Sequence, residues 1–194
     1  RFDDPWISDN RPGGYLRLGL PESSGVLAAV DPRTNTVAWK QEIPGGRLAT
    51  SGPLSTAGGL VFWGSADGQL DAYDARTGER LWIFHTIPRP GQFGRDTWLS
   101  DSAVYTGNTG VWGQISVDLE LGLAYLPVEA ATGDYFGANR PGNNLFAESL
   151  VAVDLRTGER RWHYQLVHHG IWDHDIPCAP ILLDLTIDGE TVKA

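Results

Sequence analysis

Apolar and polar residues alternate in three separate stretches of the chain, as expected for strands with one buried face. The paired apolar positions are Leu27 and Ala29, Leu70 and Ala72, and Leu150 and Ala152. Each stretch runs into an Asp, whose side chain can bind backbone N–H groups two or three residues further on and so begin a turn. Since no stretch of any length has helical periodicity, the pattern predicts β-hairpins.

The three stretches belong to one repeated motif that ends in a tryptophan. It covers 29–39, 72–82 and 152–162, and the second copy reads Ala-Tyr-Asp-Ala-Arg-Thr-Gly-Glu-Arg-Leu-Trp. Gly78 and Gly158 supply the positive φ that such a turn commonly needs, and Asn35 is the next most tolerant residue. Each Trp opens the returning strand, where its ring can dock neighbouring sheets. Such self-similarity is typical of stacked supersecondary units.

The spacing of the motif predicts an all-β fold, a partial β-propeller of about three four-stranded blades. The interval from Ala29 to Ala72 fits the ~40–50 residues of one blade, and that from Ala72 to Ala152 is about twice as long. The longer interval shows one further strand pair, Val111–Val117 and Gly122–Val128, so we expect one blade with two site-building insertions. The expected blades lie near 20–45, 46–86 and 110–167, a further blade starts at 176–194, and the insertions are 87–110 and 129–145.

Composition narrows the classes of function. The 24 Gly and 12 Pro suit many tight turns, and a net charge of −9 without Lys/Arg patches argues against a nucleic-acid partner. Cys178 is the only cysteine, and no apolar run approaches the ~20 residues of a membrane span. With Arg1 first and no methionine, we expect a piece of a longer product, and about three blades should not close a ring alone.

Two places could carry chemistry. Asp173 and Asp175 lie in the polar stretch 168–175, and on an extended segment they would project to the same side and could hold a hard cation such as Ca²⁺. The alternatives are a solvated turn or a transition-metal site, although no zinc-type Cys/His pattern is present. Trp112 lies between Gly110 and Gly113, which would let a flat ligand approach, or it is another core or docking Trp.

Several motifs resemble one family. They are 87–94 (Ile-Pro-Arg-Pro-Gly-Gln-Phe-Gly), 106–108 (Thr-Gly-Asn), 140–143 (Arg-Pro-Gly-Asn), 144–150 (Asn-Leu-Phe-Ala-Glu-Ser-Leu) and 168–175 (His-His-Gly-Ile-Trp-Asp-His-Asp). Together they resemble the pyrroloquinoline-quinone (PQQ)-dependent alcohol and glucose dehydrogenases, in particular the membrane-bound glucose dehydrogenase branch. The resemblance implies an eight-bladed propeller that oxidises an alcohol or sugar by hydride transfer to the quinone.

The resemblance also implies roles for single residues. Asp173 matches the catalytic base, which lies beside the metal, and Trp112 matches the indole floor under the quinone. His168 and His169 match a histidine pair near the cofactor. Asp175 stands where some relatives add a carboxylate ligand to the metal, which is Ca²⁺, with Mg²⁺ or a lanthanide as alternatives. Gly133 stands where relatives have a metal-binding Asn, so Asp134 is the expected replacement ligand.

The same resemblance implies partners and a location. The electron acceptor would be ubiquinone or cytochrome c, and the location would be the periplasm, with membrane association through a segment outside this chain. The chain alone should be inactive without the remaining blades, which supply other site residues. A non-catalytic quinoprotein-like scaffold that binds proteins is the alternative, and a hydrolase is weaker because Asp173 and Asp175 do not flank a cleft.

Overall fold

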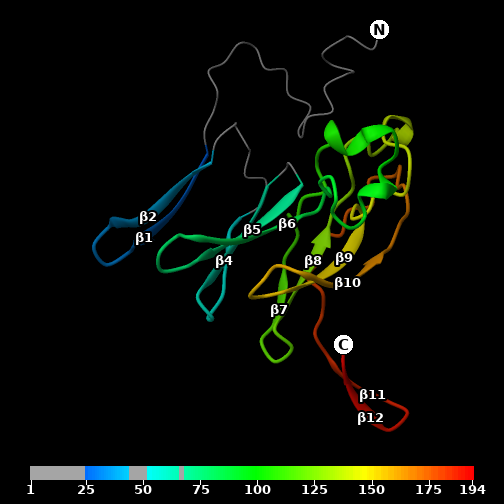
Figure 1. The fold of residues 1–194 in the computed structure, drawn as a ribbon. Coiled ribbons are helices and arrows are strands. Elements are labelled where there is room, and N and C mark those ends of the chain that lie inside the picture. The colour runs from blue at the N-terminus through cyan, green and yellow to red at the C-terminus, as the bar shows by residue number, and fades with distance from the viewer. Residues whose placement is uncertain (1–24, 44–51, 66–67) are drawn as a thin grey trace, which may run out of the picture.

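The computed structural model describes residues 25–43, 52–65 and 68–194, so the expected blade residues 20–24 and 44–51 lie outside the described part. Two four-stranded antiparallel sheets dominate it (Figure 1). The first contains β3 (Leu54–Ser55), β4 (Leu60–Ser65), β5 (Gln69–Asp74) and β6 (Arg80–His85) in that order. The second contains β7 (Ser116–Asp118), β8 (Leu123–Val128), β9 (Ser149–Asp154) and β10 (Arg160–Gln165), also in chain order. The expected all-β, partial-propeller fold is confirmed.

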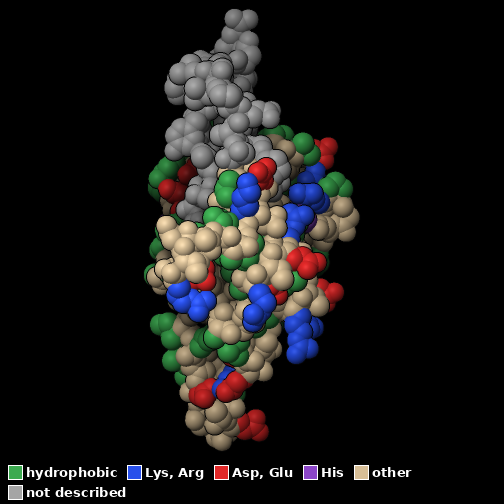
Figure 2. Space-filling model, turned by 90° about the vertical axis from the view of Figure 1, so that its left-hand side faces the viewer, with side chains coloured by type: hydrophobic (Ala, Val, Ile, Leu, Met, Phe, Trp, Pro, Cys, Tyr) green, Lys and Arg blue, Asp and Glu red, His purple; other side chains and the backbone are tan. Residues whose placement is uncertain are grey.

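Two hairpins flank these sheets. One is formed by β1 (Gly25–Asp31) and β2 (Thr36–Ile43), the other by β11 (Asp184–Ile187) and β12 (Glu190–Lys193). They lie at opposite sides of the molecule in Figure 1. On the face toward β1 and β2, Lys and Arg side chains are scattered among acidic and apolar ones (Figure 2). Within the described ranges, no helix is long and apolar enough to span a bilayer.

The repeated turns form as the motif predicts. Asp74 Oδ1 accepts hydrogen bonds from the backbone N–H groups of Arg76 and Thr77, both at 2.8 Å. Asp154 binds the corresponding N–H groups of its own turn at 2.8 and 3.1 Å. The residues expected in the left-handed region adopt it: φ is 54° at Asn35, 74° at Gly78 and 70° at Gly158. Because these interactions are local, each hairpin is specified by its own few residues.

The tryptophans of the first two repeats connect adjacent sheets, as predicted. Trp82 at β6 reaches the second sheet, where its Nε1 donates a 3.0 Å hydrogen bond to the Leu155 carbonyl. Trp39 at β2 reaches the first sheet in the same way and donates to the Ala75 carbonyl at 2.9 Å. Trp82 also joins the main core between the two sheets, where its ring centroid lies 5.7 Å from that of Phe62. The contacts repeat because the motif repeats.

The strand pair expected in the second sheet differs in one respect. The predicted strand Val111–Val117 contributes only Ser116 and Val117 to β7, whereas β8 agrees with the expected Gly122–Val128 except at Gly122. Residues 111–115 instead continue the first insertion past the end of the sheet, and Val111 is buried in the core. Alternation of apolar residues there reflects burial against the core rather than strand pairing.

The two insertions pack on each other beyond the sheets. They contain only short 3-10 helices, at Arg95–Thr97 (η1), Leu99–Val104 (η2) and Gly137–Asn139 (η3). Residues 107–110 run beside 129–132, with backbone hydrogen bonds from Thr109 N to Ala130 O and from Glu129 N to Gly110 O, both 3.1 Å. A small apolar cluster of Ile87, Trp98, Ala131 and Ala147 joins the insertions. The insertions therefore form one layer at this end of the second sheet.

Candidate functional site

The insertion junction carries a buried carboxylate that the sequence did not single out. Glu129 directly follows β8, is 6% exposed, and accepts a 2.8 Å hydrogen bond at Oε1 from the Gly110 N–H. Burial raises the pKa of Glu129 to about 7; the Gly110 N–H opposes this rise, and the negative charges of Asp175, Asp173 and Asp134 add to it. Four acidic side chains thus share one electrostatic neighbourhood. In the sequence, the signal that could have identified Glu129 is a carboxylate directly after an apolar strand.

Asp173 comes to this place from the segment that follows β10. The segment 168–175 is irregular rather than extended as expected, and Asp173 has a left-handed backbone with φ 54°. Its side chain is half-buried, and Oδ2 accepts a 3.2 Å hydrogen bond from the Tyr135 hydroxyl. Asp173 therefore meets the second insertion with its carboxylate partly open to solvent. The extended backbone that the same-side argument assumed is not formed at Asp173, because the backbone is left-handed there.

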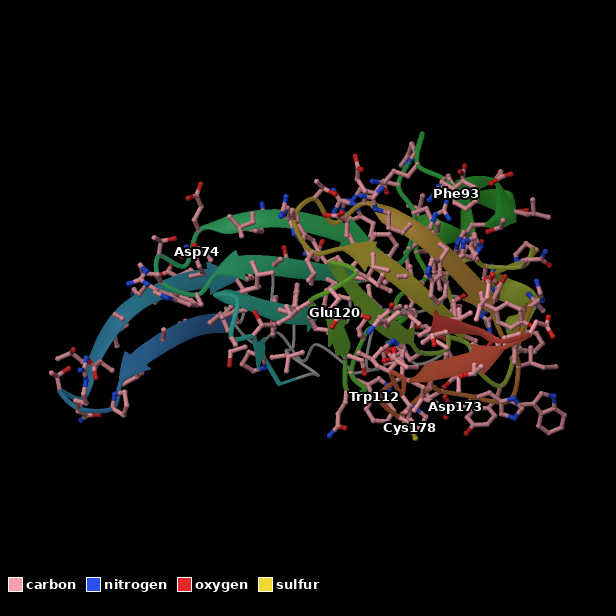
Figure 3. All side chains as sticks on the ribbon, turned by 90° about the horizontal axis from the view of Figure 1, so that it is seen from below. Asp74, Phe93, Trp112, Glu120, Asp173 and Cys178 are labelled. Atoms are coloured by element: carbon pink, nitrogen blue, oxygen red, sulfur yellow. The ribbon has the colours of Figure 1, made fainter. Side chains whose placement is uncertain are left out.

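Asp175 links this acidic group to Trp112. Its Oδ1 accepts a 2.9 Å hydrogen bond from the Ala130 N–H. Burial raises the pKa of Asp175, while the hydrogen bonds from Ala130 N–H and the Trp112 indole lower it and the charge of Asp173 raises it further. Trp112 is 41% exposed, unlike the docking residue Trp82 at 8%. Figure 3 shows Trp112 and Asp173 along the same edge of the molecule. An exposed indole beside a carboxylate suits a flat ligand better than a core role does.

The donor set suits a hard cation but does not enclose one. Asp134, Asp173 and Asp175 carry oxygen ligands of the kind that Ca²⁺ prefers, and all three raise the pKa of Glu129 through their charges. Nevertheless, no group of three or more His, Cys, Asp or Glu side chains within 25–43, 52–65 and 68–194 is gathered closely enough to hold a metal ion. A complete coordination sphere from described residues alone is not formed. The metal ligands remain a prediction.

The two histidines have different surroundings. His168 is exposed, whereas His169 is half-buried with a left-handed φ of 51°. His169 Nδ1 lies 2.8 Å from the Gly142 carbonyl and 3.2 Å from Asn144 Oδ1. Since both partners are acceptors, Nδ1 carries the proton. His169 thus attaches the segment 168–175 to the second insertion, which also carries Asp134.

Two buried side chains of opposite charge, Arg140 and Glu148, lie near each other in and just after the second insertion. Arg140 and Glu148 are each 1% exposed. Burial lowers the pKa of Arg140 and the charge of Glu148 raises it, whereas burial raises the pKa of Glu148 and the charge of Arg140 lowers it. Arg140 and Glu148 stood in quoted motifs, but the sequence assigned them no role, because nothing local shows that they are buried.

Comparison with known proteins shows the family of this chain. The family model of the PQQ glucose/ethanol/alcohol dehydrogenase β-propeller domain matches residues 63–194. The chain is 36% identical to the quinoprotein glucose dehydrogenase of Escherichia coli over 91% of this chain and 25% of that protein. It is 31% identical to the quinohemoprotein alcohol dehydrogenase ADH-IIG of Pseudomonas putida over 93% of this chain and 28% of that protein.

A solved structure shows the same relationship in three dimensions. The quinohemoprotein alcohol dehydrogenase of Comamonas testosteroni superimposes with a TM-score of 0.75 and 28% identity, covering 87% of this chain and 28% of that one. The chain therefore spans about a quarter of the length of these relatives. By the match of its repeated sheets and both insertions, the chain belongs to the PQQ-dependent glucose, ethanol and alcohol dehydrogenase β-propeller family.

Proposed function

We propose that this chain contributes the base and the cofactor floor to a PQQ-dependent oxidation of an alcohol or sugar. The observation that carries the proposal is that the exposed Trp112 indole lies near enough to Asp175 to affect its pKa, and that Asp175 is two residues from the half-buried Asp173 carboxylate. Trp112 would support the quinone ring by stacking, since a flat aromatic ligand and an indole gain from face-to-face offset contact. PQQ, when bound, supplies the hydride acceptor.

Asp173 would accept the proton of the substrate hydroxyl. A general base must present a free carboxylate lone pair within hydrogen-bond reach of that proton. Asp173 Oδ2 is already bound by the Tyr135 hydroxyl, which orients the carboxylate and leaves its other oxygen for substrate. Glu129 and Asp175 place further negative charge in the neighbourhood of Asp173, and a bound cation would offset that charge.

A metal ion would supply that positive charge. Asp173, Asp175 and Asp134 would contribute oxygen ligands to Ca²⁺, with Mg²⁺ or a lanthanide as alternatives, and further ligands would come from outside the described residues. The ion would act as a Lewis acid on a quinone oxygen. His168 and His169 would border the cofactor site. Electrons would leave to ubiquinone or cytochrome c, in the periplasm.

The test uses the whole protein that carries this chain. Dye-linked oxidation of ethanol and D-glucose is measured after loading with PQQ and Ca²⁺, for wild type, Asp173→Asn and Asp188→Asn. Asp188 is the matched control because it is exposed, lies in the β11–β12 turn and has a left-handed φ of 52° that Asn tolerates. We expect Asp173→Asn to remove turnover, Asp188→Asn to keep it, and EDTA to abolish activity that Ca²⁺ restores.

Two results would contradict the proposal. Turnover retained by Asp173→Asn would exclude Asp173 as the base. If the whole protein shows no change in Trp fluorescence on titration with the quinone and no turnover, the non-catalytic scaffold would be the better interpretation.

A further inference from the structure

Arg140 and Glu148 have no part in the proposed chemistry, although both are charged and almost completely buried, each at 1% exposure. Burying a charge is unfavourable unless specific partners replace water. Their partners lie in the two segments that carry Asp134 and Asp173. The two charged side chains therefore contact the backbone of these segments and do not only fill space in the core.

Arg140 joins the two segments through its guanidinium group. Nε donates to the Thr132 carbonyl and Nη2 to the Gly133 carbonyl, both at 3.2 Å, directly before Asp134. Nη2 also donates to the Gly170 carbonyl, three residues before Asp173. The planar fork of an arginine can serve several carbonyls at fixed angles, which a lysine cannot do. One side chain therefore ties the backbone near both carboxylates.

Glu148 holds the Asp173 segment from the other side. Its carboxylate lies against Gly170, where an added Cβ would come within 1.7 Å of Glu148 Oε2. Burial raises the pKa of Glu148, and the backbone N–H groups of Gly170 and His174 are among the groups that oppose this rise, although Oε1 has no hydrogen-bond partner among the described residues. Since these two N–H groups lie on either side of Asp173, Glu148 faces the segment before and after that residue.

The segment needs such attachments because its backbone is strained. His169 and Asp173 both adopt left-handed conformations, with φ of 51° and 54°. Side chains with a Cβ persist in this region only where the surrounding structure holds them. Arg140 donates to the Gly170 carbonyl of the segment and the Glu148 carboxylate lies against the same glycine, so two buried charged side chains contact the segment.

We infer that Arg140 and Glu148 are positioning residues, which fix the Asp173 segment against the Asp134 segment and thereby set the place of the proposed base. The inference rests on the proposed function for its catalytic part. Its structural part, the local order of residues 168–175, can be measured independently.

The experiment compares Arg140→Lys, Glu148→Ala and Glu148→Gln with wild type in the PQQ- and Ca²⁺-loaded whole protein. Backbone amide exchange is followed by mass spectrometry in peptides covering 168–175 and, as an internal reference, 123–128. We expect at least about tenfold faster exchange in 168–175 for Arg140→Lys and Glu148→Ala, with the reference unchanged. In the same variants kcat should fall roughly 30- to 100-fold with a much smaller change in KM, since a displacement of about 1 Å can cost that much.

Two further variants sharpen the result. Glu148→Gln keeps an acceptor for the N–H groups and should retain clearly more kcat than Glu148→Ala. Arg161→Lys makes the same chemical change in an exposed ion pair, 2.7 Å from Asp154, and should leave both measurements as in wild type.

Wild-type exchange of 168–175 in both Arg140→Lys and Glu148→Ala would overturn the inference. Equally faster exchange in 168–175 and 123–128 would also overturn it, because that outcome shows general destabilisation. If Arg140→Lys does not fold, the two Glu148 variants decide. If Asp173→Asn stays active while 168–175 loosens locally in the positioning variants, the proposed base is wrong and the positioning role stands.

Discussion

The indole of Trp82 lies against Gly158 of the neighbouring sheet, so closely that a Cβ on this glycine would be 2.5 Å from ring atom Cε3. The same contact joins Trp39 to Gly78, with an added Cβ at 2.6 Å from the ring. In both cases the indole N–H donates to a carbonyl of the same turn, that of Leu155 or Ala75. The repeated glycine therefore meets two requirements. It adopts the positive φ of its turn, and its missing side chain leaves room for the indole from the preceding sheet.

This relationship predicts that Gly158→Ala is unusually costly. Gly158 and Gly122 have similar left-handed φ values, 70° and 67°, but nothing lies within 4 Å of a Cβ on Gly122. Gly122→Ala should cost roughly 1–2 kcal/mol of unfolding free energy from backbone strain alone. Gly158→Ala should cost a further 1–3 kcal/mol, roughly, from the steric overlap with Trp82. Urea unfolding measures both, and equal losses would show that the indole yields without penalty.

Trp82→Phe tests the hydrogen bond of the docking residue. Phe keeps an aromatic ring next to Phe62 but removes the Nε1 donor, which leaves the Leu155 carbonyl without that partner. We expect a loss of about 1–3 kcal/mol in unfolding free energy from the lost bond. Trp162→Phe is the control because this repeat tryptophan is 40% exposed and packs on Tyr125. A loss at Trp82 no larger than at Trp162 would contradict the docking role.

The affinity for PQQ tests the cofactor floor. Trp112→Ala should weaken quinone binding roughly 5- to 150-fold, because stacking of a flat ring on an aromatic side chain contributes about 1–3 kcal/mol. Trp162→Ala is the control, since Trp162 is a repeat tryptophan in β10 that packs on Tyr125. Equilibrium dialysis of the whole protein with PQQ and Ca²⁺ gives the dissociation constants. Similar losses in both variants would remove Trp112 from the site.

Glu129 should make stability fall with rising pH in metal-free protein. Its pKa is raised from 4.5 to about 7 by burial, with Asp134, Asp173 and Asp175 adding to the rise. Between these pH values the folded protein holds a proton that the unfolded chain has lost, so the slope of stability against pH is negative. Stabilisation of Glu129→Gln relative to wild type should therefore grow from pH 5 to pH 8.

The measurement is the melting temperature in the presence of EDTA, with Glu159→Gln as an exposed control. A difference between Glu129→Gln and wild type that does not change with pH would show that Glu129 is not protonated in the folded protein at neutral pH.

Local features of the fold could be predicted from the sequence because they depend on neighbouring residues. The Asp of each repeat accepts a hydrogen bond from the backbone N–H two positions further on, and it does so in every copy. The docking of Trp39 and Trp82 followed from the same repetition, since one repeat must bury its large side chain against the next. The repeated turns and the all-β fold were therefore accessible without coordinates, and the family followed from the resemblance of several motifs.

Features that depend on long-range packing were not accessible. Residues 111–115 read as strand but lie outside β7, and Asp173 turns into a left-handed conformation where an extended segment was expected. Glu129, Arg140 and Glu148 appeared as ordinary charged residues, because burial is a property of the insertions packed together and not of any stretch of sequence.

The amino-acid sequence alone determined the repeating sheets, their turns and the identity of the acidic segment with Trp112, since these depend on interactions between residues close along the chain. Only the tertiary structure decided which carboxylates share one electrostatic field and which buried charges hold them. Those relationships join segments far apart in the chain, and the low polarity of their common interior makes each charge act on the others.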